Sequence, residues 1–235
     1  MTSDEAVKQF EGIKYRYMCD RNPTAAREEL QGIFDYCFDA YLADASFKKV
    51  LDRAYSLLRR IENAAEPSLP QGYRYDLCYA LEDMIFSANI VLSESGSEIQ
   101  LECEEAKTFV NLDLKSFSYV ILCLLANAVS YSDGKKTAVK LTVFDGFAGI
   151  SVTSRGHFDS EVFQRAVGSD SSLGFVGRFM NSAGGSLVMT DGDGTVTVAL
   201  KIPIADRNLP CTLPISVDEL LYDRLSVLYI AFCGH

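Results

Sequence analysis

One amide side chain lies within a run of apolar residues, and it is the clearest candidate for chemistry in the chain. Asn127 interrupts the stretch 120–132, in which Val, Ile, Leu and Ala recur at helical spacing. An unpaired polar group in an apolar core costs about 1–3 kcal/mol. Asn127 should therefore either bond to neighbouring backbone or face a cleft that holds a ligand.

The elements that must position Asn127 predict an α+β domain between residues 73 and 205. Helical and alternating apolar patterns follow one another along this stretch. We expect a helix over 77–88, strands at 99–103 and 108–112, a helix that begins after Asp113, a hairpin over 137–153, a polar loop over 154–171 with a short helix at 159–167, a helix over 173–183 and a hairpin over 186–202. This order is typical of a sandwich in which helices cover one face of a mixed sheet.

Residues 1–66 are expected to form a separate helical domain, and a Pro- and Gly-containing linker at 67–72 follows it. The apolar stripe over 4–43 predicts one long helix, or two helices around a kink at Pro23. A second amphipathic helix over 47–61 would complete an antiparallel helical hairpin. This pair leaves its apolar stripes uncovered, so we expect a homodimer through a four-helix bundle.

The tail over 206–235 has Pro210 and Pro214 in a linker, and an amphipathic helix is expected over 220–232. Two readings are open, because this helix can dock on the domain's own surface or bind a partner. Cys233 and His235 could hold a metal, although two ligands alone make a weak site.

Composition limits the classes of function. The chain has 235 residues, 48% of them hydrophobic and 23% charged, which is typical of a globular protein. Its net charge of −10 argues against nucleic acid or an anionic membrane as a partner. We expect a cytoplasmic protein without a membrane span, because no stretch resembles a signal peptide, no apolar run approaches about 20 residues, and the seven cysteines are scattered singly.

Three short motifs follow one another in the second half of the chain: the stretch 125–132 around Asn127, the glycine-containing stretch 172–186 and the hairpin stretch 193–203. Together and in this order they resemble the N box, the second glycine box with the helix after it, and the closing hairpin of bacterial sensor histidine kinases of two-component systems. The resemblance covers about residues 4–205. It implies a histidine kinase-like ATPase domain, which binds ATP between its helices and its sheet.

The resemblance also implies roles for particular residues. Asn127 takes the place of the residue that holds the Mg²⁺ bridging the ATP phosphates, and Mg²⁺ prefers hard oxygen ligands. Tyr131 lies one helical turn later and would be near the nucleotide. Gly174 belongs to the second glycine box, although it could equally be only a turn residue.

The phosphoacceptor motif of the family has lost its reactive residue. Arg21-Asn22-Pro23 matches the end of the box, but Met18 stands where the family has its phosphoacceptor His, and Cys19 replaces the acid beside it. A thioether cannot accept a phosphoryl group as an imidazole nitrogen does. Asn22 survives where the family positions a water for dephosphorylation of a response regulator.

The adenine-binding motif is also altered. Ser154 replaces the Asp that accepts a hydrogen bond from adenine, and charge-assisted bonds are roughly twice as strong as neutral ones. Gly156 keeps the first glycine, whereas Phe158 replaces the second and could fill part of the adenine pocket. Arg155 and Arg165 are the nearest side chains able to bind phosphate.

These departures favour a degenerate histidine kinase homologue, a pseudokinase that dimerises and binds a response regulator or a related kinase. The alternative is a protein that still binds Mg-ATP, and acts as a switch or phosphorylates a separate protein. A third reading is a module that sequesters a partner on its helical hairpin and ignores nucleotide. Whether the chain is an enzyme therefore stays open.

Overall fold

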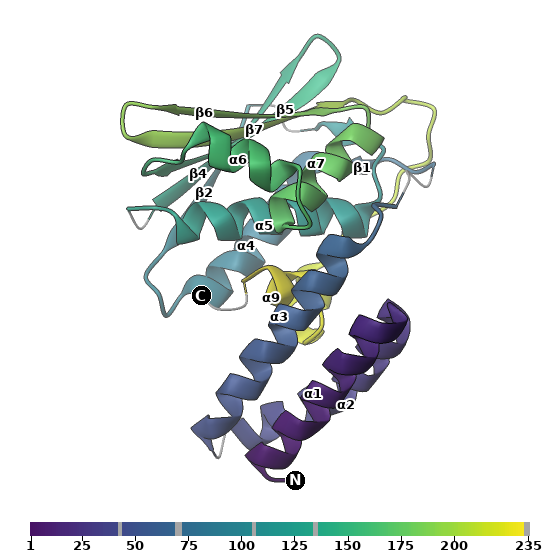
Figure 1. The fold of residues 1–235 in the computed structure, drawn as a ribbon. Coiled ribbons are helices and arrows are strands. Elements are labelled where there is room, and N and C mark those ends of the chain that lie inside the picture. The colour runs from purple at the N-terminus through teal and green to yellow at the C-terminus, as the bar shows by residue number, and fades with distance from the viewer. Residues whose placement is uncertain (42–43, 69–71, 105–106, 134–135, 233–235) are drawn as a thin grey trace. The chain divides into compact units, whose positions relative to one another are not determined.

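A computed structural model describes residues 1–41, 44–68, 72–104, 107–133 and 136–232 (Figure 1). The chain divides into two compact units, of which the first is Met1–Glu62 and the second begins at Asn63. Part of the expected linker, residues 69–71, lies outside the described residues, as do Cys233 and His235.

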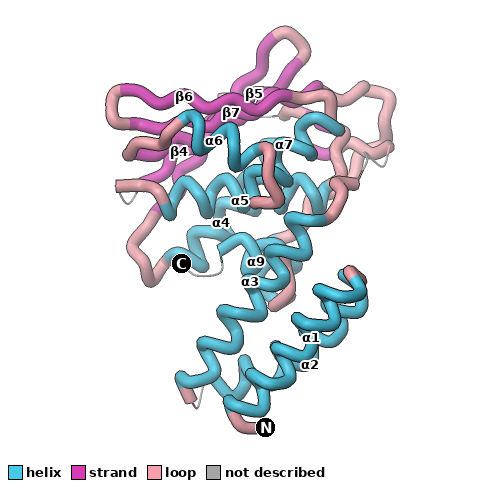
Figure 2. The backbone as a smooth tube through the Cα atoms, in the orientation of Figure 1, coloured by secondary structure: helices cyan, strands magenta, loops and turns pink. Residues whose placement is uncertain are grey.

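The first unit starts with two separate helices, α1 (Ser3–Asp20) and α2 (Pro23–Tyr41). Of the two expectations for 4–43, one long helix is wrong, and two helices that meet near Pro23 are found. They are joined by a reversal and not by a kink, because Arg21 adopts the left-handed conformation (φ 51°). The Tyr36 hydroxyl lies 2.8 Å from the amino terminus, so the two helices run antiparallel (Figure 2). Asn22 caps α2 through a hydrogen bond from the Ala25 N–H (3.1 Å), and Pro23 takes the first helical position.

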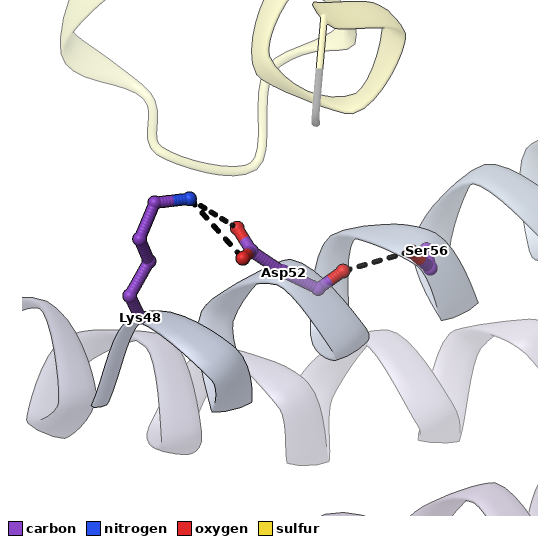
Figure 3. Close-up of polar contacts among 3 residues, drawn as sticks. All are labelled: Lys48, Asp52 and Ser56. Atoms are coloured by element: carbon purple, nitrogen blue, oxygen red, sulfur yellow. Dashed lines mark hydrogen bonds and ion pairs between the residues drawn. The ribbon is translucent and has the colours of Figure 1, made fainter. Parts of the chain in front are cut away.

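A third helix, α3 (Lys48–Ala64), follows the short 3₁₀ turn η1 (Ala45–Phe47). Lys48 pairs with Asp52 at 3.1 Å on its first turns, and the Ser56 hydroxyl donates to the Asp52 carbonyl (Figure 3). Between α2 and α3, the rings of Phe34 and Tyr55 lie 4.5 Å apart.

The apolar side chains of α1 and α2 are buried within a single chain. Phe10 and Ile13 of α1, and Leu30, Ile33 and Phe34 of α2, are at most 3% exposed. The expectation that these stripes stay uncovered is therefore wrong, since α1 folds back and covers what a second chain was expected to cover.

The second unit contains a five-stranded mixed sheet. Its strands are β2 (Glu98–Cys103), β4 (Lys136–Phe144), β5 (Phe147–Arg155), β6 (Ser186–Gly192) and β7 (Thr195–Pro203), in the order β2-β4-β5-β7-β6. β2 is parallel to β4, and the other pairs are antiparallel. The strand expected at 108–112 is β3 (Phe109–Val110), which pairs with β1 (Tyr75–Asp76) in a separate two-stranded sheet.

Helices α4 (Leu77–Leu92), α5 (Leu114–Ser130), α6 (Ser160–Val167) and α7 (Ser172–Ser182) lie on one face of the five-stranded sheet (Figure 1). Alternate residues of the strands, such as Val139 and Ile150, point toward this layer and are buried. Asp113 caps α5, as expected, by accepting a 2.8 Å bond from Ser116 N–H. The α+β fold class is thereby confirmed.

The tail docks on its own domain, which is the first of the two readings for it. Arg74 bonds through its backbone to Pro210 and Thr212 (2.9 and 2.8 Å). Two short helices, α8 (Val217–Tyr222) and α9 (Val227–Phe232), then pack against α4 and α5 in place of the single expected helix. Among the described residues, none of the helices combines the length and apolar character needed to cross a membrane.

Candidate functional site in the pocket beside α5

A pocket in the second unit lies between the C-terminal half of α5 and the sheet. It brings together three of the residues singled out from the sequence, namely Asn127, Tyr131 and Ser154. The remaining lining residues are all apolar: Leu124, Ala128, Val152, Phe158, Phe163, Leu173, Met189, Val196 and Val198.

Asn127 faces this pocket from α5 and is half-buried. Within the described part of the chain, its amide side chain forms no hydrogen bond, so the alternative that it bonds to neighbouring backbone is not seen there. Ser154 lies opposite on β5, where it is 7% exposed and pairs in register with Thr137 and Val196. A neutral amide and a hydroxyl are therefore the polar groups that a ligand would meet first.

Phe158 lines the pocket and packs against its aromatic neighbours. Its ring packs edge-on against Tyr131, with 5.1 Å between the ring centroids, and against Phe163 at 6.4 Å. The remaining cavity has a volume of about 40 Å³, space for about three water molecules. Ligand pockets usually measure about 300–1,000 Å³. A nucleotide base therefore does not fit unless lining side chains such as Phe158 move.

The Asp191 carboxylate on β6 holds the segment that carries Phe158. One carboxylate oxygen accepts the Phe158 N–H at 3.2 Å, and the other lies 3.2 Å from His157 Nδ1. Sequence reasoning missed Asp191, because it is 33 residues from Phe158 in a hairpin with no motif of its own. The position of the Phe158 ring thus depends on a contact between distant parts of the chain.

The two glycines have structural roles beside the pocket but do not line it. Gly156 has φ 139°, which favours glycine, and a Cβ there would lie 2.8 Å from the Tyr131 carbonyl oxygen. Gly174 lies in the first turn of α7, where a Cβ would lie 1.6 Å from the Ser169 carbonyl oxygen. Both glycines therefore allow close backbone approach, and Gly174 is more than a turn residue.

The pocket offers little to a phosphate or a metal. None of its lining side chains is charged. Arg155 is exposed, and Arg165 Nε donates to the Glu161 carbonyl within its own helix. The described residues contain no cluster of three His, Cys, Asp or Glu that could hold a metal ion. Asn127 supplies a hard oxygen suited to Mg²⁺, but a cavity of about 40 Å³ is too small for a Mg-nucleotide in this arrangement of side chains.

The segment that resembles a phosphoacceptor box lies in the first unit. Met18 is on α1 with its side chain 54% exposed, and Cys19 beside it is also exposed. Asn22 uses its side-chain oxygen to cap α2. This segment therefore presents no imidazole, and its amide already serves a structural purpose.

Comparisons with known proteins show the class of fold. No protein-family model matches the chain, and no curated protein sequence matches it. The solved structure of full-length ShkA in complex with AMPPNP is 19% identical, with a TM-score of 0.55, over 68% of this chain and 37% of that one. The Acinetobacter baumannii histidine kinase AdeS is 12% identical, with a TM-score of 0.50, over 86% and 96% of the two chains.

The nucleotide-free catalytic domain of the histidine kinase ThkA is also similar, at 16% identity and a TM-score of 0.47 over 53% of this chain and 92% of that one. At these identities, similarity establishes fold and not activity. The second unit has the fold of a histidine kinase-like ATPase domain, which confirms the expected fold.

Proposed function

We propose that the chain is a histidine kinase homologue without kinase chemistry, and that it acts by binding a response regulator or a kinase of a two-component system. One observation carries this proposal: the pocket beside α5, in which this fold would hold a nucleotide, is only about 40 Å³ in volume, and the Phe158 ring packs against Tyr131 in its lining. Substitution of the phosphoacceptor by Met18 and of the adenine-binding carboxylate by Ser154 supports the same conclusion.

Calorimetric titration with Mg-AMPPNP tests the loss of nucleotide binding. We expect no saturable heat at millimolar nucleotide with folded protein, because the cavity is small and Ser154 stands in place of the carboxylate for adenine. A phosphotransfer assay with labelled ATP should leave the protein unlabelled. Label on a residue of α1 would refute the proposal.

Two substitutions test whether Ser154 and Phe158 cause the loss of nucleotide binding. Ser154→Asp restores a carboxylate but leaves the Phe158 ring in place, so this variant should still not bind. Adding Phe158→Gly removes an aromatic ring from the lining and enlarges the cavity. The double variant should bind Mg-AMPPNP with a Kd of about 1 mM or lower, which corresponds to a binding free energy of about −4 kcal/mol or more favourable. Val162→Ala is a matched control on an exposed residue of α6, and it should change nothing.

The partner-binding surface belongs to the same proposal. The exposed face of α1 carries Tyr15 (71% exposed) and Met18 (54%) beside the Asn22-Pro23 reversal. Exposed aromatic and Met side chains are common in protein interfaces. Purified receiver domains from the same genome should bind the full chain with micromolar Kd, and Tyr15→Ala with Met18→Ala should weaken binding at least tenfold. Unchanged affinity would exclude this surface.

A homodimer is also part of the proposal, although the stripes that first suggested it are buried within one chain. A dimer must then use exposed side chains. Light scattering at tens of micromolar should give twice the 26.0 kDa chain mass. A mass of one chain would remove dimerisation, while leaving partner binding to be tested by the receiver domains.

A second candidate function is a switch that binds Mg-ATP without transferring phosphate. It is favoured by the convergence of Asn127, Tyr131 and Ser154 on one pocket, where the Asn127 amide meets no described partner. This function requires Phe158 to leave the cavity. Saturable binding of Mg-AMPPNP to the unaltered chain, abolished by Asn127→Ala, would favour the switch over the first proposal.

A further inference from the structure

The exposed face of helix α4 carries three large apolar side chains. Tyr79, Phe86 and Ile90 are 49%, 58% and 44% exposed. Their spacing of seven and four residues places them in one stripe along the helix. The rest of α4 is buried against β2, α5 and the tail helices α8 and α9. The core of the second unit is therefore complete without this stripe.

Such a stripe is unusual on a helix that already has a buried face. Single exposed apolar residues are common on protein surfaces, whereas a group of them on one element marks an interaction site. In the part of the chain that the structure describes, Tyr79, Phe86 and Ile90 form no aromatic-ring contact and no side-chain hydrogen bond. No contact of these kinds therefore explains why the three side chains are apolar.

The charges around the stripe have one sign. Glu82 and Asp83 lie within it, the first exposed and the second half-buried. Helix α8, which packs beside α4, adds Asp218 and Glu219. Helices α4, α8 and α9 together contain these four acidic residues and no Lys or Arg. Among the described residues, none of the four forms an ion pair, so their negative charge is available to a partner.

Basic residues in neighbouring elements do not offset this charge. Lys136 and Lys140 of β4 alternate with the buried side chains of that strand, so they lie on the sheet face opposite the helices. There they pair with acidic residues of β2, at 3.9 and 3.6 Å. Arg74, which precedes β1, lies over the Phe109 ring at 4.6 Å. Arg224, which follows α8, is half-buried and interacts within the chain.

We propose that the α4 stripe, formed by Tyr79, Phe86 and Ile90 with Glu82 and Asp83, is a docking surface for a basic amphipathic helix of a partner protein. Apolar side chains of the partner cover the three exposed side chains, and its Lys or Arg residues pair with the carboxylates. Burial raises the pKa of Asp83, and Glu82 adds to the effect. A cation at this position favours the charged carboxylate and lowers that pKa.

The sign of the charge decides among possible occupants. A second copy of the chain brings the same acidic side chains to the stripe, and an anionic lipid surface or a nucleic acid is also negative, so each of these is repelled. A basic partner is attracted. The stripe lies outside the pocket beside α5 and outside the surface at Tyr15 and Met18, so this inference can fail without the proposed function, and the reverse.

Fluorescence anisotropy with a labelled peptide and the full chain tests the proposal. The probe is an amphipathic Leu/Lys peptide of about 18 residues, long enough to form a helix when bound. A Leu/Lys peptide of scrambled order and a Leu/Glu peptide of the same pattern are the controls. We expect a Kd of about 10 µM for the probe, at least tenfold weaker binding of the scrambled peptide and no binding of the Leu/Glu peptide.

The apolar part of the stripe has its own variant. Phe86→Ser with Ile90→Ser should weaken binding of the probe at least tenfold, because two of the three apolar side chains are lost. Val188→Ser is the matched control on β6, where Val188 is 53% exposed, and it should leave the affinity unchanged. Since all three side chains are exposed, circular dichroism should show the same fold in both variants.

The acidic part is tested by salt. Raising NaCl from about 20 to about 200 mM should weaken binding of the probe severalfold, and Glu82→Gln with Asp83→Asn should reduce both the affinity and this salt dependence. Asp170→Asn, at an exposed position between α6 and α7, should change neither.

Three results would overturn the proposal. The first is equal binding of the probe and either control peptide. The second is an unchanged affinity of the variant Phe86→Ser with Ile90→Ser. The third is a dimer in light scattering that this variant converts to a monomer, which would assign the stripe to a second copy of the chain.

Discussion

At the scale of a residue, Gly174 shows how closely backbone can approach a helix where a side chain is missing. Gly174 has an ordinary helical environment except that the Ser169 carbonyl lies where its Cβ would be, 1.6 Å away. Gly32 in α2 also lies inside a helix, but it has no atom within 4 Å of the Cβ position. Replacing each glycine by alanine therefore separates the effect of helix propensity from the steric effect of the added methyl group.

Gly174→Ala should destabilise the chain by at least ~2 kcal/mol, because the backbone around Ser169 must move to admit the methyl group. Helix propensity alone would predict a gain of about 1 kcal/mol. Gly32→Ala is the matched control, and it should stabilise by about 0.5–1 kcal/mol. Urea unfolding monitored by circular dichroism measures both, and equal effects would contradict the steric account.

At the scale of an element, the start of α2 explains an otherwise odd motif. The Asn22-Pro23 pair forms an N-cap and a first helical residue, and Arg21 provides the left-handed reversal before it. The same three residues that resemble a phosphoacceptor box therefore have a complete structural explanation in this chain.

Asn22→Ala should cost about 1 kcal/mol, because it removes the side-chain acceptor for the Ala25 N–H. Asn22→Ser and Asn22→Asp keep a side-chain acceptor, so each should lower the free energy of unfolding by no more than a few tenths of a kcal/mol. Chemical denaturation of the three variants provides the measurement. If serine and alanine destabilise alike, the cap does not hold the reversal.

The tail helix α9 closes the helical layer over α5. Leu228 is completely buried, whereas Tyr222 on the preceding helix α8 is 82% exposed. Leu228→Ala should destabilise the second unit by about 2–5 kcal/mol through the cavity it leaves, and Tyr222→Ala should change stability by less than about 0.5 kcal/mol. Thermal unfolding of both variants tests this, and a harmless Leu228→Ala would mean that the tail is not part of the core.

At the scale of the whole molecule, local patterns predicted most of the second unit. The alternation of Val139 and Leu141 and the Asp145-Gly146 turn were sufficient to predict the β4–β5 hairpin, because strand period and turn chemistry are local properties. The reversal at Arg21 was not predictable, since Arg-Asn-Pro fits a kinked helix as well as a new one.

The pocket was only partly predictable for the same reason. Asn127, Tyr131 and Ser154 were found through a motif resemblance, and the structure brings them together. The Phe158 backbone is held by Asp191, which lies 33 residues further along the chain on β6, and no local pattern encodes such a contact. Polar contacts between residues far apart in the sequence were therefore not predictable from local patterns.

The net charge of −10 affects the whole chain and leads to a last prediction. The excess of 32 acidic over 22 basic side chains repels itself and opposes the compact state. Raising NaCl from 10 to 150 mM shortens the screening length from about 30 to about 8 Å. We expect Tm to rise by about 2–4 °C, equivalent to ~1 kcal/mol, in scanning calorimetry at constant pH. Potassium chloride should act identically, because screening depends on ionic strength. A falling Tm would show that local pairs such as Lys48–Asp52 outweigh the overall repulsion, since salt weakens those pairs as well.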